Sequence, residues 1–319
     1  MDVPILAWVG ALGVILVMVA IDLVVFHREA HEVTVREASV WTAAWIALGL
    51  GFGGVIAWHW GAGPAGQYLA GYLLEKSLAV DNLFIFAVIF SAFAIPPRFQ
   101  HRILFWGVMG ALVLRAGFIA GGIALLDRFH WTIYLFGGVL LFTAWRTWAH
   151  REREPDPSTS QTIVTLRRFL PMTSSFRGQH FLTREGGRRL ATPLLAALVA
   201  VELADIAFAV DSVPAVLAVT REPFLVYTSN AFAILGLRSM YFFLAVMIRR
   251  FQYLRVGLVF ILTFVGSKMM LVDLVEIPIW ASLAVIVMVL AVSVLASARK
   301  ATPAGGAAAA ENPGEEAEA

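Results

Sequence analysis

The chain alternates long apolar runs with short polar segments. Nine of the runs hold about 20 mostly apolar residues, enough to cross a bilayer as a helix. The first run has no basic region before it and no small-residue cleavage site after it, so we interpret it as a retained helix. The pattern predicts an all-α, polytopic transmembrane bundle of about nine helices, at residues 3–26, 40–60, 65–94, 102–125, 130–149, 192–218, 224–248, 255–275 and 278–298.

Composition agrees with a bilayer setting and excludes several kinds of chemistry. Of the 319 residues, 60% are hydrophobic and 14% are charged, whereas a soluble domain is about 25% charged. The absence of cysteine excludes disulfides, zinc–thiolate sites and thiol nucleophiles. No HExxH motif, nucleophile–base pair or glycine-rich phosphate loop is present in the sequence, so we expect no enzyme activity.

Basic residues lie in short segments between the apolar runs, where they act as topology signals and not as a nucleic-acid surface. The arginine-rich segment 150–191 is predicted to be cytoplasmic. Counting spans outward predicts an external N-terminus and a cytoplasmic C-terminus. The lipid bilayer is the expected partner, and no nucleic acid is. Residues 301–319, rich in Ala, Gly, Pro and Glu, are predicted to be disordered.

Two groups of three spans resemble each other. Residues 75–82 (Glu-Lys-Ser-Leu-Ala-Val-Asp-Asn) match 205–212 (Asp-Ile-Ala-Phe-Ala-Val-Asp-Ser). Residues 111–115 match 234–238, and 137–143 match 257–263, in the same order. Units with an odd number of spans are inverted in the membrane, the usual framework of secondary transporters. The alternative is chance likeness between apolar segments.

The repeat suggests a division of the chain. The predicted parts are two N-terminal helices, a first repeat, a cytoplasmic basic loop, a second repeat, a last helix and a disordered tail, at 1–64, 65–149, 150–191, 192–275, 276–300 and 301–319.

Charged residues fall inside two of the predicted spans. Span 65–94 carries Glu75, Lys76 and Asp81, and span 192–218 carries three carboxylates, Glu202, Asp205 and Asp211. Each charge at a helix centre costs about 2.5–3.5 kcal/mol, so five carboxylates cost on the order of 10 kcal/mol, comparable to the stability of a whole domain. Basic partners, protonation or a bound cation must offset this cost.

Two explanations stay open at this point. In the first, basic residues within the spans simply pair with the carboxylates and hold the bundle together. In the second, the carboxylates bind a transported cation and the basic residues are counter-charges that stabilise the cation-free state. The clustering of three carboxylates in one span favours the second. The counter-charges would be Arg115, Arg238, Lys76 and Lys268.

Helix geometry refines the cation hypothesis. Asp205 and Asp211 are six residues apart, which places them about 120° apart around a regular helix. Pro214 lies three residues after Asp211, and proline inside a helix frees a carbonyl about one turn upstream. We therefore predict that the helix unwinds near 210–214 and exposes carbonyl ligands beside Asp211, as in cation transporters.

The predicted ligands are hard oxygen donors, which suit Mg²⁺, Ca²⁺ or Mn²⁺. No cofactor is expected to be bound permanently, since the cation is the cargo. Asp22 and Asp273 lie near helix ends and are expected to reach water. The predicted metal ligands are Asp81 and Asp211 at the centre, with Asn82, Ser212, Glu75, Glu202 and Asp205 around them or along the path.

Three motifs at 75–84 (EKSLAVDNLF), 201–220 (VELADIAFAVDSVPAVLAVT) and 227–239 (YTSNAFAILGLRS) resemble the signatures of the TerC family of bacterial membrane proteins, in its Alx-like branch. The resemblance covers roughly residues 20–297. It implies a manganese exporter of the inner membrane, historically linked to tellurium resistance. It also implies that the family's acidic transport residues fall on Glu75, Asp81, Glu202, Asp205 and Asp211. Residues 143–148 depart from the family pattern, as do Leu203 and Ala204, which stand where two threonines are common.

We therefore expect a multi-pass protein of the inner (plasma) membrane that exports Mn²⁺, with Ca²⁺ as the other candidate cargo, by alternating access of its two repeats. The alternative is a membrane assembly factor, or a metal- and pH-stress factor, without transport activity of its own. Such a factor would bind other membrane proteins or a second copy through the 150–191 loop.

Overall fold

The computed structural model describes residues 3–27, 34–149, 173, 178, 180–185, 188–247, 252–275 and 277–300. The side chain of Asp81 lies outside the described residues, although its backbone is part of a helix. The tail 301–319, predicted to be disordered, also lies outside them, as does most of the 150–191 loop.

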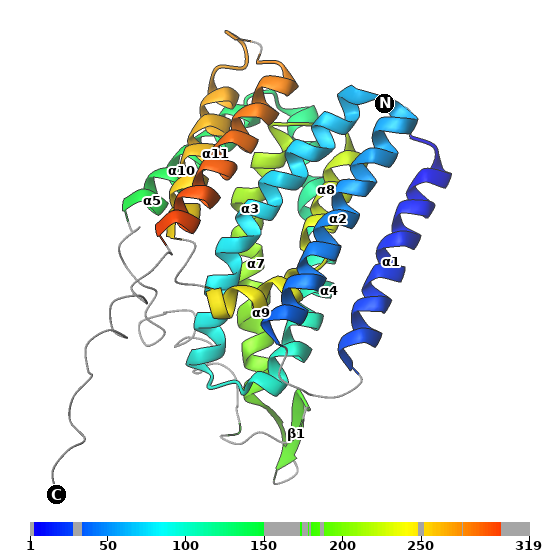
Figure 1. Ribbon diagram of the computed structural model, residues 1–319, viewed down its shortest axis with the longest axis vertical. Coiled ribbons are helices and arrows are strands. Elements are labelled where there is room, and N and C mark those ends of the chain that lie inside the picture. Colours follow the sequence, from blue (N-terminus) through cyan, green and yellow to red (C-terminus); the bar gives the residue numbers. More distant parts are fainter. Residues whose placement is uncertain are drawn as a thin grey trace, which may run out of the picture.

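Long helices form nearly all of the described chain (Figure 1). Every apolar run that predicted a span contains helix. The helices are α1 (Ile5–His27), α2 (Val35–Trp60), α3 (Ala62–Ala92), α4 (Pro97–Arg128), α5 (Thr132–Ala149), α7 (Pro193–Leu217), α8 (Pro223–Ile234), α9 (Leu237–Met247), α10 (Gln252–Met270) and α11 (Ile279–Lys300).

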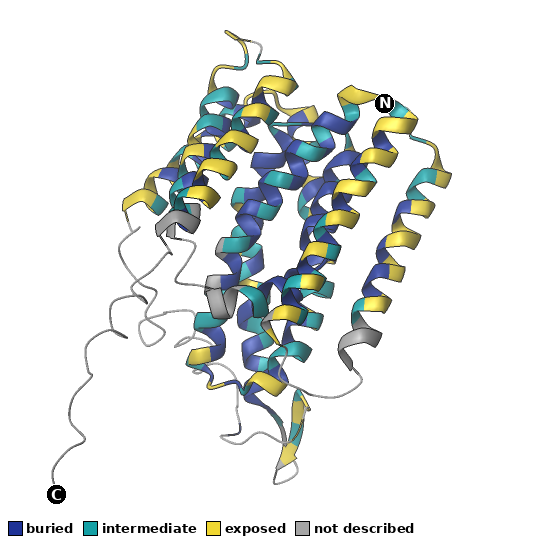
Figure 2. Ribbon diagram, viewed as in Figure 1, coloured by how far each residue is buried: buried dark blue, intermediate teal, exposed yellow. Residues whose placement is uncertain are grey.

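Length and hydropathy single out membrane-crossing helices. Five described segments are long and apolar enough: Ile5–Asp22, Arg36–Trp60, Pro97–Arg128, Pro193–Leu217 and Ile279–Ser297. The outer helices α1, α2 and α11 carry long exposed stripes, whereas α3 and α7 are mostly buried (Figure 2). The exposed stripes are apolar, with Leu6 80% exposed and Val292 60% exposed. Exposed apolar surface of this extent is expected where helices face lipid.

Helix α7 is continuous through Val210–Pro214, so the predicted unwinding there is wrong. Pro214 lacks one backbone donor, but helical bonding resumes after it, since the Ala218 N–H donates to the Pro214 carbonyl at 3.0 Å. An interior proline removes one hydrogen bond and need not end a membrane helix when its neighbours pack against it. Consequently α7 offers no unwound carbonyl ligands beside Asp211.

The interruption lies instead in the next span, 224–248, which folds as α8 and α9. Leu235 between them has extended backbone, with φ −58° and ψ 132°, and Gly236 has φ +81°. Glycine adopts a positive φ without the steric cost of a Cβ. A Cβ at Gly236 would also collide with the Trp45 side chain of α2. Gly236 is therefore the residue that permits the break.

The buried helices α3 and α7 contact each other, and each also packs against a further helix. Helix α3 packs on α8, and α7 packs on α4. Helices α5 and α10 lie side by side at one edge of the bundle, and α1 lies at the opposite edge (Figure 1). This arrangement brings the charged segments of α3 and α7 into the interior.

Strands β1 (Leu182–Glu185) and β2 (Arg188–Ala191) form an antiparallel hairpin, with Leu182 opposite Ala191. The hairpin lies within the loop predicted at 150–191, so it adds a small strand pair to the all-α expectation. It projects from the end of the bundle opposite the N-terminus, at the start of α7 (Figure 1). The Thr192 N–H donates to the Phe181 carbonyl at 3.0 Å and ties the hairpin to α7.

Candidate functional site

A buried arginine joins the acidic residues of the two central helices. The Arg115 guanidinium on α4 forms an ion pair with Glu75 on α3 and a second with Asp205 on α7, the latter at 3.0 Å. It also donates to the Ser212 hydroxyl at 3.2 Å. All four residues are buried, and Glu75 is fully inaccessible at 0% exposure. The pairing offsets much of the cost of placing these charges inside the bundle.

Asp211 faces a different neighbour. Its carboxylate accepts a hydrogen bond from the Thr143 hydroxyl on α5 at 2.7 Å. Arg146, one helical turn further along α5, interacts electrostatically with the same carboxylate. Because α7 is unbroken, the wide angle between Asp205 and Asp211 is retained, and the two carboxylates cannot bind one small ion together.

Glu202 lies one turn before Asp205 on α7 and is half-buried against α4. Its carboxylate occupies the space beside Gly110, where the Cβ of any other residue would collide with it. The Glu202 Oε2 atom is buried without a hydrogen-bond partner among the described residues. A desolvated carboxylate oxygen with no donor is the type of group that a cation or a proton would satisfy.

The other three predicted counter-charges contact different groups. The Arg238 guanidinium on α9 pairs with Asp22 on α1 at 3.2 Å. Asp22 was expected to reach water, but its side chain is only 13% exposed and this prediction is wrong. Lys76 donates to the carbonyls of Ala233 and Leu235. Of the four, Arg115 is therefore the one that the described structure joins to predicted metal ligands.

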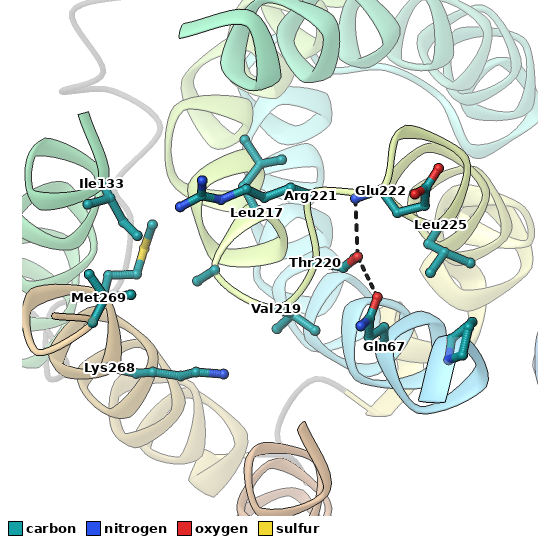
Figure 3. Close-up of a pocket in the computed structure, with 13 residues that line it drawn as sticks. Gln67, Ile133, Leu217, Val219, Thr220, Arg221, Glu222, Leu225, Lys268 and Met269 are labelled. Carbon is teal, nitrogen blue, oxygen red and sulfur yellow. Dashed lines mark hydrogen bonds between the residues drawn. The ribbon is translucent and has the colours of Figure 1, made fainter. Parts of the chain in front are cut away.

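Lys268 lines a cavity of about 470 Å³ at the end of the bundle where α7 ends and α8 begins (Figure 3). Its ammonium group donates to the Ser282 hydroxyl at 3.0 Å. Across the cavity the Thr220 hydroxyl donates to the Gln67 side chain at 2.7 Å and accepts from the Glu222 N–H at 3.2 Å. The cavity is thus a polar opening at the end of α7 that follows Asp211.

Asp273 near the same end of the bundle is exposed, as predicted. It accepts a hydrogen bond from Tyr134 and lies 3.8 Å from the His130 imidazole. It belongs to the surface and not to the interior network.

The structure brings together three of the seven predicted ligands, Glu75, Asp205 and Ser212, around Arg115. Asn82 is buried on α3, and the side chain of Asp81 lies outside the described residues. Within the described part of the chain, no three carboxylate or imidazole groups converge on one metal position. The acidic groups of α7 instead occupy successive positions along the helix.

Sequence reasoning missed three residues of this region: Thr143, Gly110 and Asp22. Thr143 belongs to the segment that departs from the family pattern, and this departure was the available signal for it. Gly110 gives no sequence signal, because its role depends on the carboxylate that passes over it. The Asp22–Arg238 pair joins residues 216 apart in sequence, a contact that the pattern of a single chain does not reveal.

Comparison with protein families gives one match over most of the chain. Residues 60–303 match the family described as "Integral membrane protein TerC family". This range contains every predicted ligand and counter-charge. No solved structure matches the chain.

Three relatives cover nearly the whole chain. "Uncharacterized membrane protein STKORF319" of Myxococcus xanthus is 51% identical over 290 residues, 91% of this chain and 91% of the relative. "Putative membrane-bound redox modulator Alx" of Escherichia coli (strain K12) is 43% identical over 302 residues, 92% of this chain and 94% of the relative. An "Uncharacterized membrane protein" of Rickettsia bellii is 32% identical over 292 residues, 92% of this chain and 97% of the relative.

Proposed function

We propose that this chain, which belongs to the TerC family of integral membrane proteins, exports a divalent metal cation, Mn²⁺ before Ca²⁺, through its intramembrane carboxylates. The observation that carries the proposal is the acidic series on α7. Asp205 is paired with Arg115 at 3.0 Å. Glu202 on one side has an oxygen without a hydrogen-bond partner among the described residues, and Asp211 on the other side accepts a hydrogen bond from the Thr143 hydroxyl and has Arg146 as its cationic neighbour.

The spacing of these groups suggests a path. Glu202 and Asp211 are nine residues apart, about 13 Å along a helix axis. In the proposed cycle a cation binds first at Glu202 and then displaces the Arg115 guanidinium from Asp205. It leaves past Asp211 toward the cavity at the end of α7. Carboxylate and hydroxyl oxygens are ligands that Mn²⁺, Mg²⁺ and Ca²⁺ accept.

Arg115 has a defined part in this cycle. In the cation-free state its guanidinium neutralises Glu75 and Asp205, whose charges would otherwise be buried without a partner. Displacement of the guanidinium by a divalent ion keeps the site neutralised. The position of Arg115 is therefore compatible with a purely structural role and with transport. The two roles differ in whether the Arg115–Asp205 ion pair opens when a cation binds.

Alternating access of two inverted three-helix repeats is the mechanism we favour. Exchange of α3 with α7, of α4 with α8 and α9, and of α5 with α10 would preserve the main helix contacts. The packing of α3 on α8 would become that of α7 on α4, and the α5–α10 contact would map onto itself. This correspondence supports the repeat inferred from sequence, and in such a repeat the acidic groups would lie at the interface of the two halves.

We further propose that the protein lies in the inner (plasma) membrane with the hairpin end of the bundle in the cytoplasm. The arginine-rich 150–191 segment supports this orientation. Glu202, nearer to the hairpin along α7, would then meet the cytoplasmic cation first. Asp211 and the cavity would lie on the external side.

A cellular experiment tests the proposal. In cells without their own manganese exporter, the wild-type chain should restore growth at toxic Mn²⁺ concentrations. Glu202→Gln should fail to do so at equal protein abundance, because it removes the charge that a hard cation needs. Deletion of Ser158–Thr165 should leave tolerance intact. The reverse pattern would contradict the proposal.

A second candidate is an assembly or stress factor without transport activity, and the name of the Escherichia coli relative, a putative redox modulator, favours it. This chain contains no cysteine, so it has no thiol of its own with which to carry electrons. Under this candidate a redox effect would be indirect, through a bound partner. Loss of stress tolerance on deletion of the 150–191 loop, with metal flux unchanged, would support it.

A further inference from the structure

The break between α8 and α9 leaves backbone carbonyls without their helical donors. In an unbroken helix the Ala233 carbonyl would accept from the Leu237 N–H and the Leu235 carbonyl from the Ser239 N–H. Here the Lys76 ammonium on α3 donates to both carbonyls, at 3.0 and 3.4 Å. A lysine side chain therefore replaces the missing backbone donors.

Carbonyl ends of broken membrane helices are a recurrent cation site. The C-terminal end of a helix also carries a partial negative charge, which favours a cation beside it. The ammonium group of the Lys76 side chain is such a cation, covalently attached to α3. It lies where an inorganic ion would contact the same oxygens.

The two halves of the chain differ at this position. In the matched segments Lys76 corresponds to Ile206, and Leu235–Gly236 corresponds to Leu112–Val113. Helix α4 is unbroken at Leu112–Val113. Lys76 on α3 thus faces the break between α8 and α9. Its counterpart Ile206 lies on α7, which packs against the continuous helix α4. This correlation indicates that Lys76 serves the break itself.

The break is supported independently of Lys76. The Trp45 side chain packs directly on Gly236, and the Ser239 hydroxyl donates to the Gly236 carbonyl at 2.8 Å. The Arg238–Asp22 pair fixes the start of α9 against α1. These contacts would hold the two carbonyls in place if the ammonium left.

We propose that the Ala233 and Leu235 carbonyls form a monovalent-cation site, filled by the Lys76 ammonium in this conformation and by K⁺ or NH₄⁺ when that side chain withdraws. The nitrogen–oxygen distances of 3.0 and 3.4 Å are hydrogen bonds from an ammonium group to the two carbonyls, and NH₄⁺ and K⁺ are the inorganic ions that resemble this group in size and charge. Neutral carbonyls also favour one charge over two. The site stands on the geometry of the break and does not require that manganese be the cargo.

Removal of the ammonium tests the site without any transport measurement. Purified Lys76→Ala should unfold at a lower temperature in choline chloride than the wild type. Replacing choline by K⁺ at equal ionic strength should raise its midpoint by about 2–4 °C. The wild type should show no such difference, because its own ammonium fills the site.

Lys268→Ala is the matched control, since it also removes a lysine from a membrane helix but one that bonds a serine hydroxyl and no carbonyl. It should respond equally to both salts. Lys76→Gln provides a second variant that keeps a neutral N–H donor group on a shorter side chain, and it should show a smaller shift in the same direction. Equal midpoints in K⁺ and choline for both Lys76 variants would overturn the proposal. So would failure of Lys76→Ala to fold in K⁺, or a K⁺ response shared by Lys268→Ala.

Discussion

The Arg115 guanidinium on α4 lies 3.0 Å from the Asp205 carboxylate on α7, with the two side chains 2% and 7% exposed. Both belong to predicted spans, and the sequence alone did not show which basic residue would contact which carboxylate. Their contact, together with Glu75, links α3, α4 and α7 at the centre of the bundle. Whether this link opens when a cation arrives distinguishes a transport role for the carboxylates from a purely structural one.

Arg115→Gln should strongly destabilise the protein, because it leaves Glu75 and Asp205 buried without a cation. Breaking a buried pair costs about 3–5 kcal/mol. Thermal unfolding in detergent should show the loss, and protein abundance in the membrane should fall. The double variant Arg115→Gln with Glu75→Gln should recover part of the stability but no manganese tolerance. A single variant as stable as the wild type would contradict the assignment of Arg115.

Gly110→Ala should reduce manganese export while leaving the fold intact. The new methyl group would collide with the Glu202 carboxylate and displace a proposed ligand. Gly117→Ala, on the same helix with open space at its Cβ position, is the matched control and should keep full activity. Manganese tolerance measured at equal abundance compares the two. Equal activity of both variants would show that the position of Glu202 does not matter.

Thr143→Val should weaken manganese transport, because the Asp211 carboxylate loses the hydroxyl that orients it at 2.7 Å. Thr143→Ser retains the hydroxyl and should behave like the wild type. We expect a rise in the manganese concentration needed for half-maximal flux of about tenfold, equivalent to roughly 1.4 kcal/mol. Identical flux in the Val and Ser variants would remove Asp211 from the path.

Reporter fusions test the orientation. A reporter within Ser158–Thr165 should be cytoplasmic, and one placed before Pro4 should be external, since the basic segment sets the topology. An odd number of spans between the two sites is what inverted repeats require. Both reporters on one side of the membrane would contradict the inverted repeat.

The apolar pattern predicted helix in every expected span, because helix formation in a membrane protein follows from long apolar runs. Nine spans were predicted, and five described helices are long and apolar enough to cross a membrane. The pattern failed where the backbone conformation depended on a single residue. Pro214 was expected to break a helix and did not, whereas the real break occurs at Gly236, whose φ of +81° has no signature in an apolar run. Pro214 removes one backbone hydrogen bond and leaves the helix continuous. The positive φ of Gly236 changes the direction of the backbone and ends the helix.

The candidate site was predictable in its residues and not in its contacts. The cost of burying charge identified Glu75, Asp205 and Arg115, and the structure joins them. The same argument treated Arg115 and Arg238 as equivalent, yet Arg238 pairs with Asp22. Partners on distant helices follow from packing, which periodicity within one span does not encode.

Manganese flux into inside-out membrane vesicles tests the central claim most directly. Vesicles with the wild-type chain should accumulate Mn²⁺ in a saturable manner. Asp211→Asn should abolish this uptake at equal abundance, because the amide keeps the shape but not the charge of the ligand. Asp273→Asn, which alters an exposed carboxylate outside the network, should leave uptake unchanged. Undiminished uptake by Asp211→Asn, or no uptake by the wild type, would contradict export through the intramembrane carboxylates.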